Sequence, residues 1–297
     1  GYERKGHIKV PKLVESCGFD LGDIQDAFEY VYETRALEAY TQKMRVFGLD
    51  HKTIESFTTA WEARDYLMDL CEAEEVEIPF LQLFHLHQGD SEGAKLINDL
   101  ATSEILGKVA SDIMGTDAVL LYQTACFVKE PGHGETAWHS DLNTAPFDTN
   151  SMITFWIPLT NVPTDDFSPL EFASESHRDF ALPYWYSNDG MEDLGPRGYT
   201  IDNHTPLKAG DATAHHGWLL HASPPNFSEI VRKALTITFV GSDTKRLPKE
   251  GRRREPDDED LEGYRSWIGQ IKPGELVSKA LPTVYDKKRR SGVSESE

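Results

Sequence analysis

The sequence is poor in cysteine and has no long apolar run. Its three cysteines are far apart, and their odd number argues against a disulfide framework and for a reducing compartment. No C-x-x-C pair, the usual mark of a zinc knuckle, occurs. No apolar stretch approaches the roughly 18 residues that a membrane-spanning helix needs. These absences predict an intracellular, cytoplasmic protein without a membrane span, and the start at Gly1 leaves open a removed targeting segment.

Positive charge is also scarce. There are 30 lysines and arginines against 50 aspartates and glutamates, a formal net charge of −20. Nucleic acids and anionic membranes bind basic surfaces, so this balance argues against both as partners, and solubility is the simpler reason for it. At 297 residues the chain suits one domain of roughly 200 to 250 residues with extensions. Nothing in the sequence indicates the oligomeric state.

The first third of the chain shows helical periodicity. Apolar residues recur every three to four positions, with acidic residues between them. The predicted helices cover 21–44, 53–74 and 92–114, and a short strand precedes them within 2–11. His85 and His87 alternate like metal ligands between the second and third helices, but packing is the commoner role for such a pair.

After Gly115 the pattern changes to short strands punctuated by proline, glycine, asparagine and aspartate. The predicted strands are 118–128, 152–159, 170–173, 211–221 and 234–240. No helical stretch alternates with them, which favours a sandwich or barrel over a parallel βαβ sheet. The predicted fold is therefore mainly β with flanking helices, built on a double-stranded β-helix core of the jelly-roll, cupin-like kind.

The predicted organisation is a single domain over residues 1–285. It comprises a helical part of about 1–115, a core of about 116–242 and a C-terminal extension of about 243–285. Residues 286–297 are predicted to be a disordered tail, in which the basic cluster 287–290 is a candidate targeting signal.

A histidine and an aspartate two residues apart stand in the segment 136–141. In a strand, His139 and Asp141 would point to the same face and could hold one metal ion. The segment 215–221 offers histidines for a third ligand. Two histidines and one carboxylate on one face of an ion leave positions for a co-substrate and O₂, as in non-haem Fe(II) oxygenases. Alone, H-x-D is a weak indication of a metal site, and a histidine at a strand end followed by an aspartate in a turn is the commoner interpretation.

The downstream sequence makes the pattern specific. Gly210-Asp211 is followed by H-x-x-x-x-H-x-S-x-x-N over 216–226, and Arg232 stands eleven positions after His221. This order resembles the phytanoyl-CoA dioxygenase family of Fe(II)- and 2-oxoglutarate-dependent oxygenases, which are built on a jelly-roll core. The resemblance covers about 122–240.

The resemblance implies a role for each matching residue. His139, Asp141 and His221 would be the iron ligands. Arg232 would bind the distal carboxylate of 2-oxoglutarate, for which a planar guanidinium can make two parallel bonds. Ser223 would add a hydroxyl to that carboxylate.

Further positions match the family less specifically. Trp156 resembles a family tryptophan beside the co-substrate, and Gln123 is expected to reach the co-substrate from the strand that leads to Lys129. Two departures are Ser140, where the family often has glutamine, and the turn 167–169, which replaces a glycine-rich turn. Neither removes a ligand.

The other histidines of the distal segment have weaker claims to bind metal. The spacing to Ser223 and Arg232 favours His221 as the ligand. His216 is expected to support the site or to pack, and His215 to face the other side of the strand.

The predicted function is an Fe(II)/2-oxoglutarate-dependent oxygenase that activates a C–H bond of a small molecule with O₂, releasing succinate and CO₂. Hydroxylation, oxidative cyclisation, desaturation and epimerisation all fit. Cyclisation would resemble the algal kainoid synthases of specialised metabolism. The acidic chain favours a small or zwitterionic substrate over an acyl-CoA. Tyr184, Trp185 and Tyr186, in the polar excursion 179–205, are candidates for substrate contact.

Two rival classes stay open. A jelly-roll protein could bind metal or ligand without turnover, and a zinc hydrolase could use the same two histidines and carboxylate. The intact triad together with Arg232 argues against the first. The second leaves Arg232 and Ser223 without a role and has no obvious general base near the motif. Succinate production separates the oxygenase from both.

Overall fold

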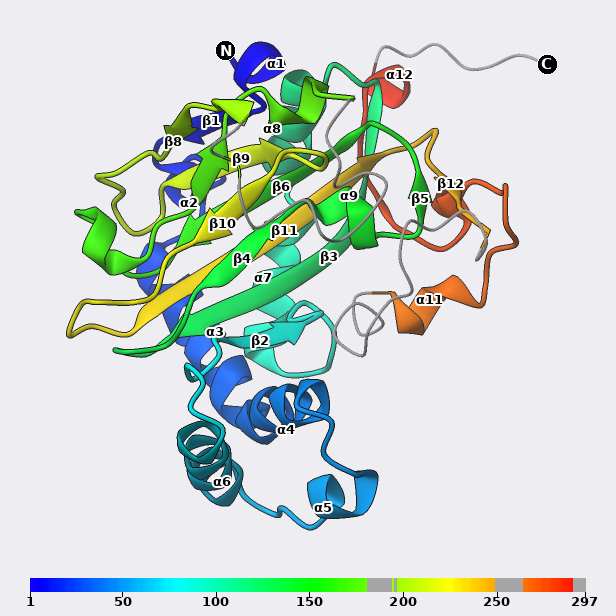
Figure 1. Ribbon diagram of the computed structural model, residues 1–297. Helices are drawn as coiled ribbons and strands as arrows, with labels where there is room; N and C mark the ends of the chain where they lie inside the picture. The colour runs from blue at the N-terminus through cyan, green and yellow to red at the C-terminus, as the bar shows by residue number, and fades with distance from the viewer. Residues whose placement is uncertain (181–193, 195–196, 249–263, 291–297) are drawn as a thin grey trace.

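Two facing antiparallel sheets form the centre of the protein (Figure 1). The computed structural model describes residues 1–180, 194, 197–248 and 264–290. The large sheet has the order β1 (His7–Val10), β9 (Ala212–His216), β6 (Met152–Pro158), β11 (Arg232–Gly241), β3 (Ala118–Lys129) and β13 (Thr283–Asp286), and β2 (Leu81–Phe84) also pairs with β3. The small sheet has the order β4 (Thr136–His139), β10 (His221–Ser223), β7 (Glu171–Ala173) and β8 (Ile201–Asp202). A third pair joins β5 (Phe147–Asp148) to β12 (Lys245–Arg246). The predicted jelly-roll core with flanking helices is confirmed.

The two faces of the large sheet differ in chemistry. Successive strand residues point to opposite faces. In β11, Leu235 and Ile237 are fully buried in the same apolar core as Phe28 of helix α3 (Leu21–Thr34). Thr236 and Thr238 alternate with them and are buried on the opposite face. One face therefore forms the core with the helices, while the other lines the space toward the small sheet with polar groups.

The helices that cover the apolar face are shorter than the sequence predicted. The predicted helix 21–44 is divided at Arg35, and the predicted helix 92–114 is divided at 102–103. In each pair, both helices bury an apolar face with the same helical periodicity. The periodicity of the sequence therefore does not show where one helix ends and the next begins. The bounds are α1 (Tyr2–Lys5), α2 (Leu13–Ser16), α3 (Leu21–Thr34), α4 (Ala36–Val46), α5 (His51–Glu55), α6 (Ala60–Ala73), α7 (Glu92–Ala101), α8 (Glu104–Met114), α9 (Asp141–Thr144), α11 (Arg265–Ile268) and α12 (Lys287–Arg290).

The predicted single strand 211–221 is wrong. The chain leaves the large sheet after His216 and enters the small sheet at His221, so β9 and β10 belong to different sheets. The turn begins at Gly217, where an added Cβ would lie 2.7 Å from the Leu142 side chain and 2.9 Å from Met152 Cβ. Only glycine fits this close approach, which turns the chain toward the small sheet.

The end of the chain also differs from the prediction. Asp286 pairs with Ala118 in the large sheet, and residues 287–290 form α12. These residues were predicted to begin a disordered tail; residues 291–297 lie outside the described residues. The pairing shows that the C-terminal extension returns to the core sheet.

Trp267 attaches this extension to the core. Its side chain is 5% exposed, stacks on Phe147 at 5.7 Å between ring centroids and meets the Tyr122 ring edge-on at 6.1 Å. We expect Trp267→Ala to lower the free energy of unfolding by about 3–5 kcal/mol, because it leaves a large cavity. Trp61→Ala, at a 66% exposed position on α6, should lower it by less than about 1 kcal/mol. Urea unfolding followed by circular dichroism measures both changes. Equal effects would show that Trp267 does not attach the C-terminal extension to the core.

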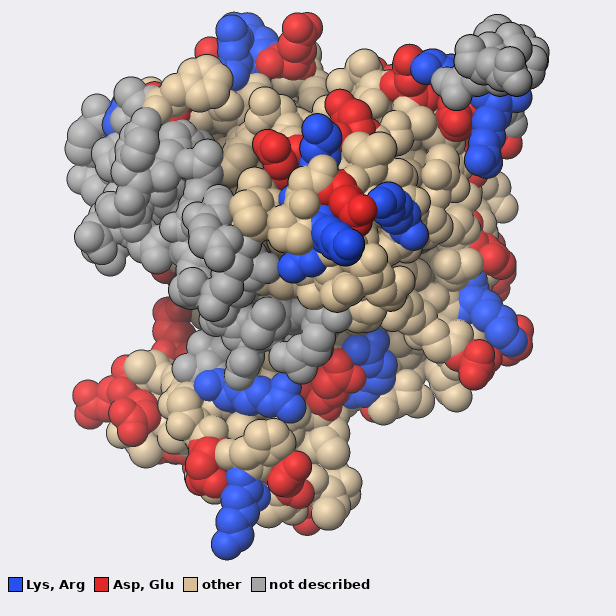
Figure 2. All heavy atoms as spheres, turned by 90° about the vertical axis from the view of Figure 1, so that its right-hand side faces the viewer, with Lys and Arg blue, Asp and Glu red and all other residues tan. Residues whose placement is uncertain are grey.

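The outer surface carries both signs of charge. In Figure 2, lysine and arginine side chains lie among aspartate and glutamate side chains on the face shown. No helix in the described part of the chain is long and apolar enough to cross a bilayer.

Candidate metal centre

A row of polar side chains crosses the inner face of the large sheet. Gln123 in β3 is paired with Thr238 in β11, Thr238 with Thr154 in β6, and Thr154 with His215 in β9. Residues directly opposite each other on neighbouring strands share a face. The hydroxyls of Thr154 and Thr238 are 3.1 Å apart, within hydrogen-bond distance. This row forms the floor on which the candidate site is built.

The H-x-D pair reaches this floor in an unexpected way. His139 ends β4, but Asp141 is the first residue of helix α9, so the prediction that one strand carries both is wrong. The turn is fixed by a hydrogen bond from the Leu142 amide to the Gly217 carbonyl. It directs Asp141 to the floor, where the Thr154 hydroxyl donates to Asp141 Oδ2 at 2.7 Å.

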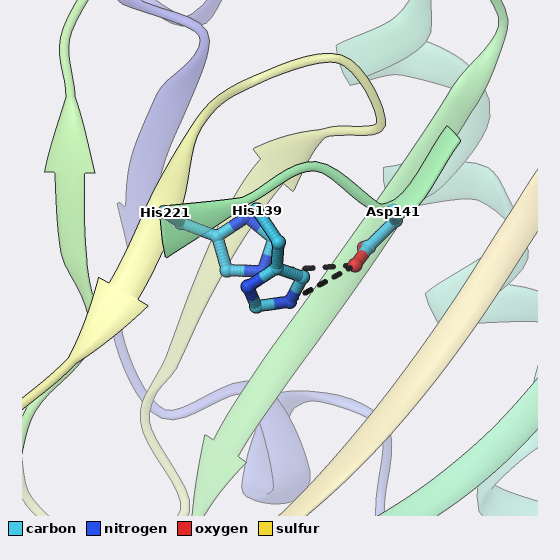
Figure 3. A group of neighbouring side chains, drawn as sticks. All are labelled: His139, Asp141 and His221. Carbon is cyan, nitrogen blue, oxygen red and sulfur yellow. Dashed lines mark ion pairs between the residues drawn. The ribbon is translucent and has the colours of Figure 1, made fainter. Parts of the chain in front are cut away.

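Two imidazoles and one carboxylate converge at this point (Figure 3). His139 and His221 are paired across β4 and β10, and their ring centroids are 4.2 Å apart. Asp141 Oδ1 lies 3.9 Å from His139 Nε2 and 3.6 Å from His221 Nε2. One ligand atom from each residue lies within 4.8 Å of the others, close enough to share one metal ion. The structure thus brings together the three residues that the sequence singled out.

Backbone carbonyls orient both imidazoles. His139 Nδ1 lies 2.8 Å from the Ala137 carbonyl, and His221 Nδ1 lies 3.0 Å from the Leu219 carbonyl. A carbonyl can only accept, so each Nδ1 carries the proton and donates it. Each Nε2 is then left with its lone pair directed at the common point, as metal coordination requires.

The charges of the three residues suit a divalent cation. Burial opposes the ionised form of Asp141, but His221, His215 and His139 together hold its pKa well below the usual range. Burial and the neighbouring His139 and His215 hold the pKa of His221 well below its usual value. At neutral pH the site therefore offers a carboxylate and a neutral imidazole, which are the forms that bind metal.

His215 was not assigned to the site from the sequence. The structure places it there: its side chain is 2% exposed, its Nε2 lies 3.3 Å from Asp141 Oδ2, and its ring centroid lies 4.2 Å from that of His221. His216 faces the other way and packs near Tyr2 and His177. His215 and Thr154 both contact Oδ2, so they hold the carboxylate with Oδ1 toward the two ligand histidines.

We expect His215→Phe to weaken Fe(II) binding by about 10- to 100-fold, because it removes a group that orients a ligand carboxylate. His215→Gln, which keeps a polar group near Oδ2, should lose less. His216→Gln is the matched control and should leave the Fe(II) affinity unchanged. Anaerobic Fe(II) titration measures all three, and equal losses in the His215 and His216 variants would contradict the role of His215.

A second polar cluster contains the predicted co-substrate residues. Arg232 is 2% exposed, its Nη2 lies 3.3 Å from Ser223 Oγ, and its guanidinium carbon lies 5.5 Å from the centroid of the Trp156 ring. Burial lowers the pKa of Arg232 to about 9, which leaves it charged at neutral pH. Within the described ranges, Arg232 has no carboxylate at ion-pair distance and its Nε has no hydrogen-bond partner. A buried, uncompensated guanidinium suits a carboxylate ligand.

The sequence also singled out Gln123 and the turn 167–169. Gln123 is part of the polar floor, and its buried Oε1 has no hydrogen-bond partner within the described part of the chain. Ser168, in the turn that replaces the family's glycine-rich segment, is fully buried with its Oγ 2.8 Å from Ser223 Oγ. The departure at 167–169 therefore lies beside Ser223. Tyr184, Trp185 and Tyr186 lie outside the described residues.

Fold and site together define a jelly-roll protein with two histidines and one carboxylate placed so that they could hold a metal ion, the arrangement of non-haem Fe(II) oxygenases. The sequence model of the phytanoyl-CoA dioxygenase (PhyH) family matches residues 27–234, about 70% of the chain. The protein belongs to the phytanoyl-CoA dioxygenase family. Its class is therefore that of Fe(II)/2-oxoglutarate-dependent oxygenase-type enzymes, with iron and 2-oxoglutarate as cofactors, and the donor atoms of His139, Asp141 and His221 fit such a metal.

Solved structures agree with this fold. The epimerase SnoN from nogalamycin biosynthesis, in complex with Fe3+, alpha ketoglutarate and nogalamycin RO, superposes with a TM-score of 0.60 at 17% identity, over 95% of each chain. The carbocyclase SnoK of the same biosynthesis gives 0.59 at 18% identity, over 95% of this chain and 93% of that one. AviO1 from Streptomyces viridochromogenes Tue57 gives 0.54 at 19% identity, over 83% and 95%. Comparison with curated protein sequences gave no match.

Proposed function

We propose that the protein oxidises a C–H bond of a small molecule, using iron held by His139, Asp141 and His221. The observation that carries the proposal is the convergence of two imidazole Nε2 atoms and Asp141 Oδ1 on one point. Family membership supports it, because the family model spans all three residues.

The co-substrate 2-oxoglutarate would lie between this point and Arg232. Arg232 binds its distal carboxylate through two parallel N–H bonds, and Ser223 adds a hydroxyl. Trp156 lines the site beside the guanidinium, and the amide of Gln123 contacts the co-substrate from the floor. Arg232 Nε and Gln123 Oε1 are both buried and have no hydrogen-bond partner in the described residues, which supports this placement.

Bound iron and 2-oxoglutarate supply the oxidising chemistry, with O₂ consumed and succinate and CO₂ released. The protein orients the ligands and limits access of water. The His221 side chain is 6% exposed, whereas that of His139 is 37% exposed. The small-molecule substrate therefore approaches from the side of His139, where its C–H bond can lie close to the metal.

Hydroxylation is the simplest outcome of this chemistry, and cyclisation or desaturation follows if the substrate radical reacts before oxygen is transferred. The fold also serves an epimerase and a carbocyclase, SnoN and SnoK. A zinc hydrolase would use the same ligands but gives no function to the buried Arg232, which has no ion-pair partner in the described residues. A non-catalytic binding protein would also use these ligands, but it would form no succinate.

The test combines anaerobic binding with turnover. Addition of 2-oxoglutarate to the Fe(II) protein without O₂ should produce the weak visible charge-transfer band of the chelate. Admission of O₂ should then release succinate and CO₂, even without substrate. Absence of the band, together with tight retention of zinc, would refute the oxygenase and favour the hydrolase.

A further inference from the structure

Two buried cations face each other beside the proposed co-substrate site. Lys129 in β3 and Arg232 in β11 are directly paired across the two strands. Their side chains are fully buried and 2% exposed, respectively. Like charges at paired, buried positions repel each other and lose hydration, so this arrangement is unfavourable unless an anion lies nearby.

Both cations meet at one hydroxyl. Lys129 Nζ lies 3.0 Å from the Ser223 carbonyl, 2.8 Å from the Pro224 carbonyl and 3.2 Å from Ser223 Oγ. Arg232 Nη2 lies 3.3 Å from the same Oγ. Ser223 is thus held from both sides, at the place where the proposed co-substrate carboxylate would bind.

Neither cation has an anionic partner in the described segments of the chain. Glu77 and Glu135 attract Lys129 without forming an ion pair with it, and His133 also interacts with it electrostatically. The Phe80 ring lies 5.8 Å from Lys129 Nζ. Burial and the charge of Arg232 lower the pKa of Lys129 to about 6, so the side chain is mostly a neutral amine at pH 7.5.

We propose that Lys129 is a positioning residue of the co-substrate site, which takes up a proton when a carboxylate binds to Arg232 and Ser223. The inference rests on the proposed function. It adds to that function a charge on Lys129 that depends on whether 2-oxoglutarate is bound. The carboxylate supplies the negative charge that the two cations lack.

The hydrogen-bond balance gives this proton a role. A neutral amine has two N–H groups for the two carbonyls and one lone pair, which can accept only from the Ser223 hydroxyl. When Nζ binds a proton from solvent, all three of its contacts become donors. The Ser223 hydroxyl hydrogen is then released from Lys129, and its remaining acceptors include the Ser168 carbonyl, 3.2 Å from Ser223 Oγ, and the bound carboxylate.

The test is the pH dependence of 2-oxoglutarate binding to the anaerobic Fe(II) protein. With proton uptake, the Kd should rise about five- to tenfold between pH 6.5 and 7.5, because free Lys129 loses its proton over this range. 2-Oxovalerate has the same chelating end but no distal carboxylate, so its Kd should lack this increase. Calorimetry in buffers of different ionisation enthalpy should show uptake of close to one proton (about 0.7–1) per 2-oxoglutarate at pH 7.5.

Variants separate the role of Lys129 from a general effect. Lys129→Met should abolish the proton uptake and weaken 2-oxoglutarate binding. Lys233→Met, at the next position of β11, is the matched control, because Lys233 pairs with Glu29 at the surface. Wild-type binding of 2-oxoglutarate without proton uptake would overturn the role of Lys129 and leave the proposed function intact. Failure to bind 2-oxoglutarate at any pH would instead refute the proposed function, and the inference with it.

Discussion

Asp141→Ala is expected to abolish Fe(II) binding at micromolar metal and, with it, all succinate formation. Asp141 is the only anionic member of the group, and its loss leaves two neutral imidazoles facing a divalent cation. Loss of a residue that merely orients a ligand weakens metal binding about 10- to 100-fold, so loss of the ligand itself should exceed about 100-fold. Anaerobic Fe(II) titration and succinate assays measure the two effects.

Control variants make this test specific. Asp148→Ala, at an exposed position in β5, removes an equal charge away from the site and should leave both quantities unchanged. Asp141→Asn keeps the shape of the side chain but lacks the charge, so it should also bind Fe(II) poorly. If Asp141→Ala binds Fe(II) within threefold of the wild type, the assignment of this carboxylate is wrong.

The three residues that converge at the candidate metal site could be predicted from the sequence because their spacing follows a linear motif. His139 and Asp141 are two apart, and His221 is fixed relative to Ser223 and Arg232 by the family pattern. The local geometry was less accessible. Asp141 opens helix α9, and the turn depends on the approach of Leu142 to Gly217, which are far apart in sequence.

The role of His215 illustrates a limit of another kind. The alternation of His215 and His216 correctly places them on opposite faces, but alternation does not say which face is occupied by the site. That choice depends on the register of β9 against β6, where His215 is opposite Thr154. The sequence signal was present: His215 follows Thr213 on the polar face, while Ala212 and Ala214 lie on the apolar face.

The fold class could be read from the sequence for a similar reason. Alternation in β11, with leucine, isoleucine and phenylalanine on one face and threonine on the other, marks a sheet with one helix-covered side. The crossing of the chain from β9 to β10 could not be predicted from the sequence, because it is caused by the close approach of Gly217 to Leu142 and Met152. Pairing of β13 with β3 joins chain segments more than 150 positions apart and leaves no local mark.

Arg232→Leu is expected to raise the KM for 2-oxoglutarate by at least about 30-fold, with little change in Fe(II) affinity. Truncating one partner of a buried, hydrogen-bonded charge pair weakens binding by about 2–5 kcal/mol. The guanidinium lies beside Ser223 and Trp156, away from the metal ligands, so metal binding and co-substrate binding should separate. Arg232→Lys restores a charge but not the two parallel N–H bonds, and should therefore lie between the wild type and the leucine variant.

The sharpest readout for Arg232 is co-substrate preference. Wild-type protein should bind 2-oxoglutarate much more tightly than 2-oxovalerate, because only the former has a carboxylate for Arg232. In Arg232→Leu the cavity at this end becomes apolar, and the preference should disappear or reverse toward 2-oxovalerate. Charge-transfer titrations without O₂ give both dissociation constants for each variant. Equal weakening of the two ligands would show that Arg232 acts on the fold of the site, and its assignment to the distal carboxylate would have to be withdrawn.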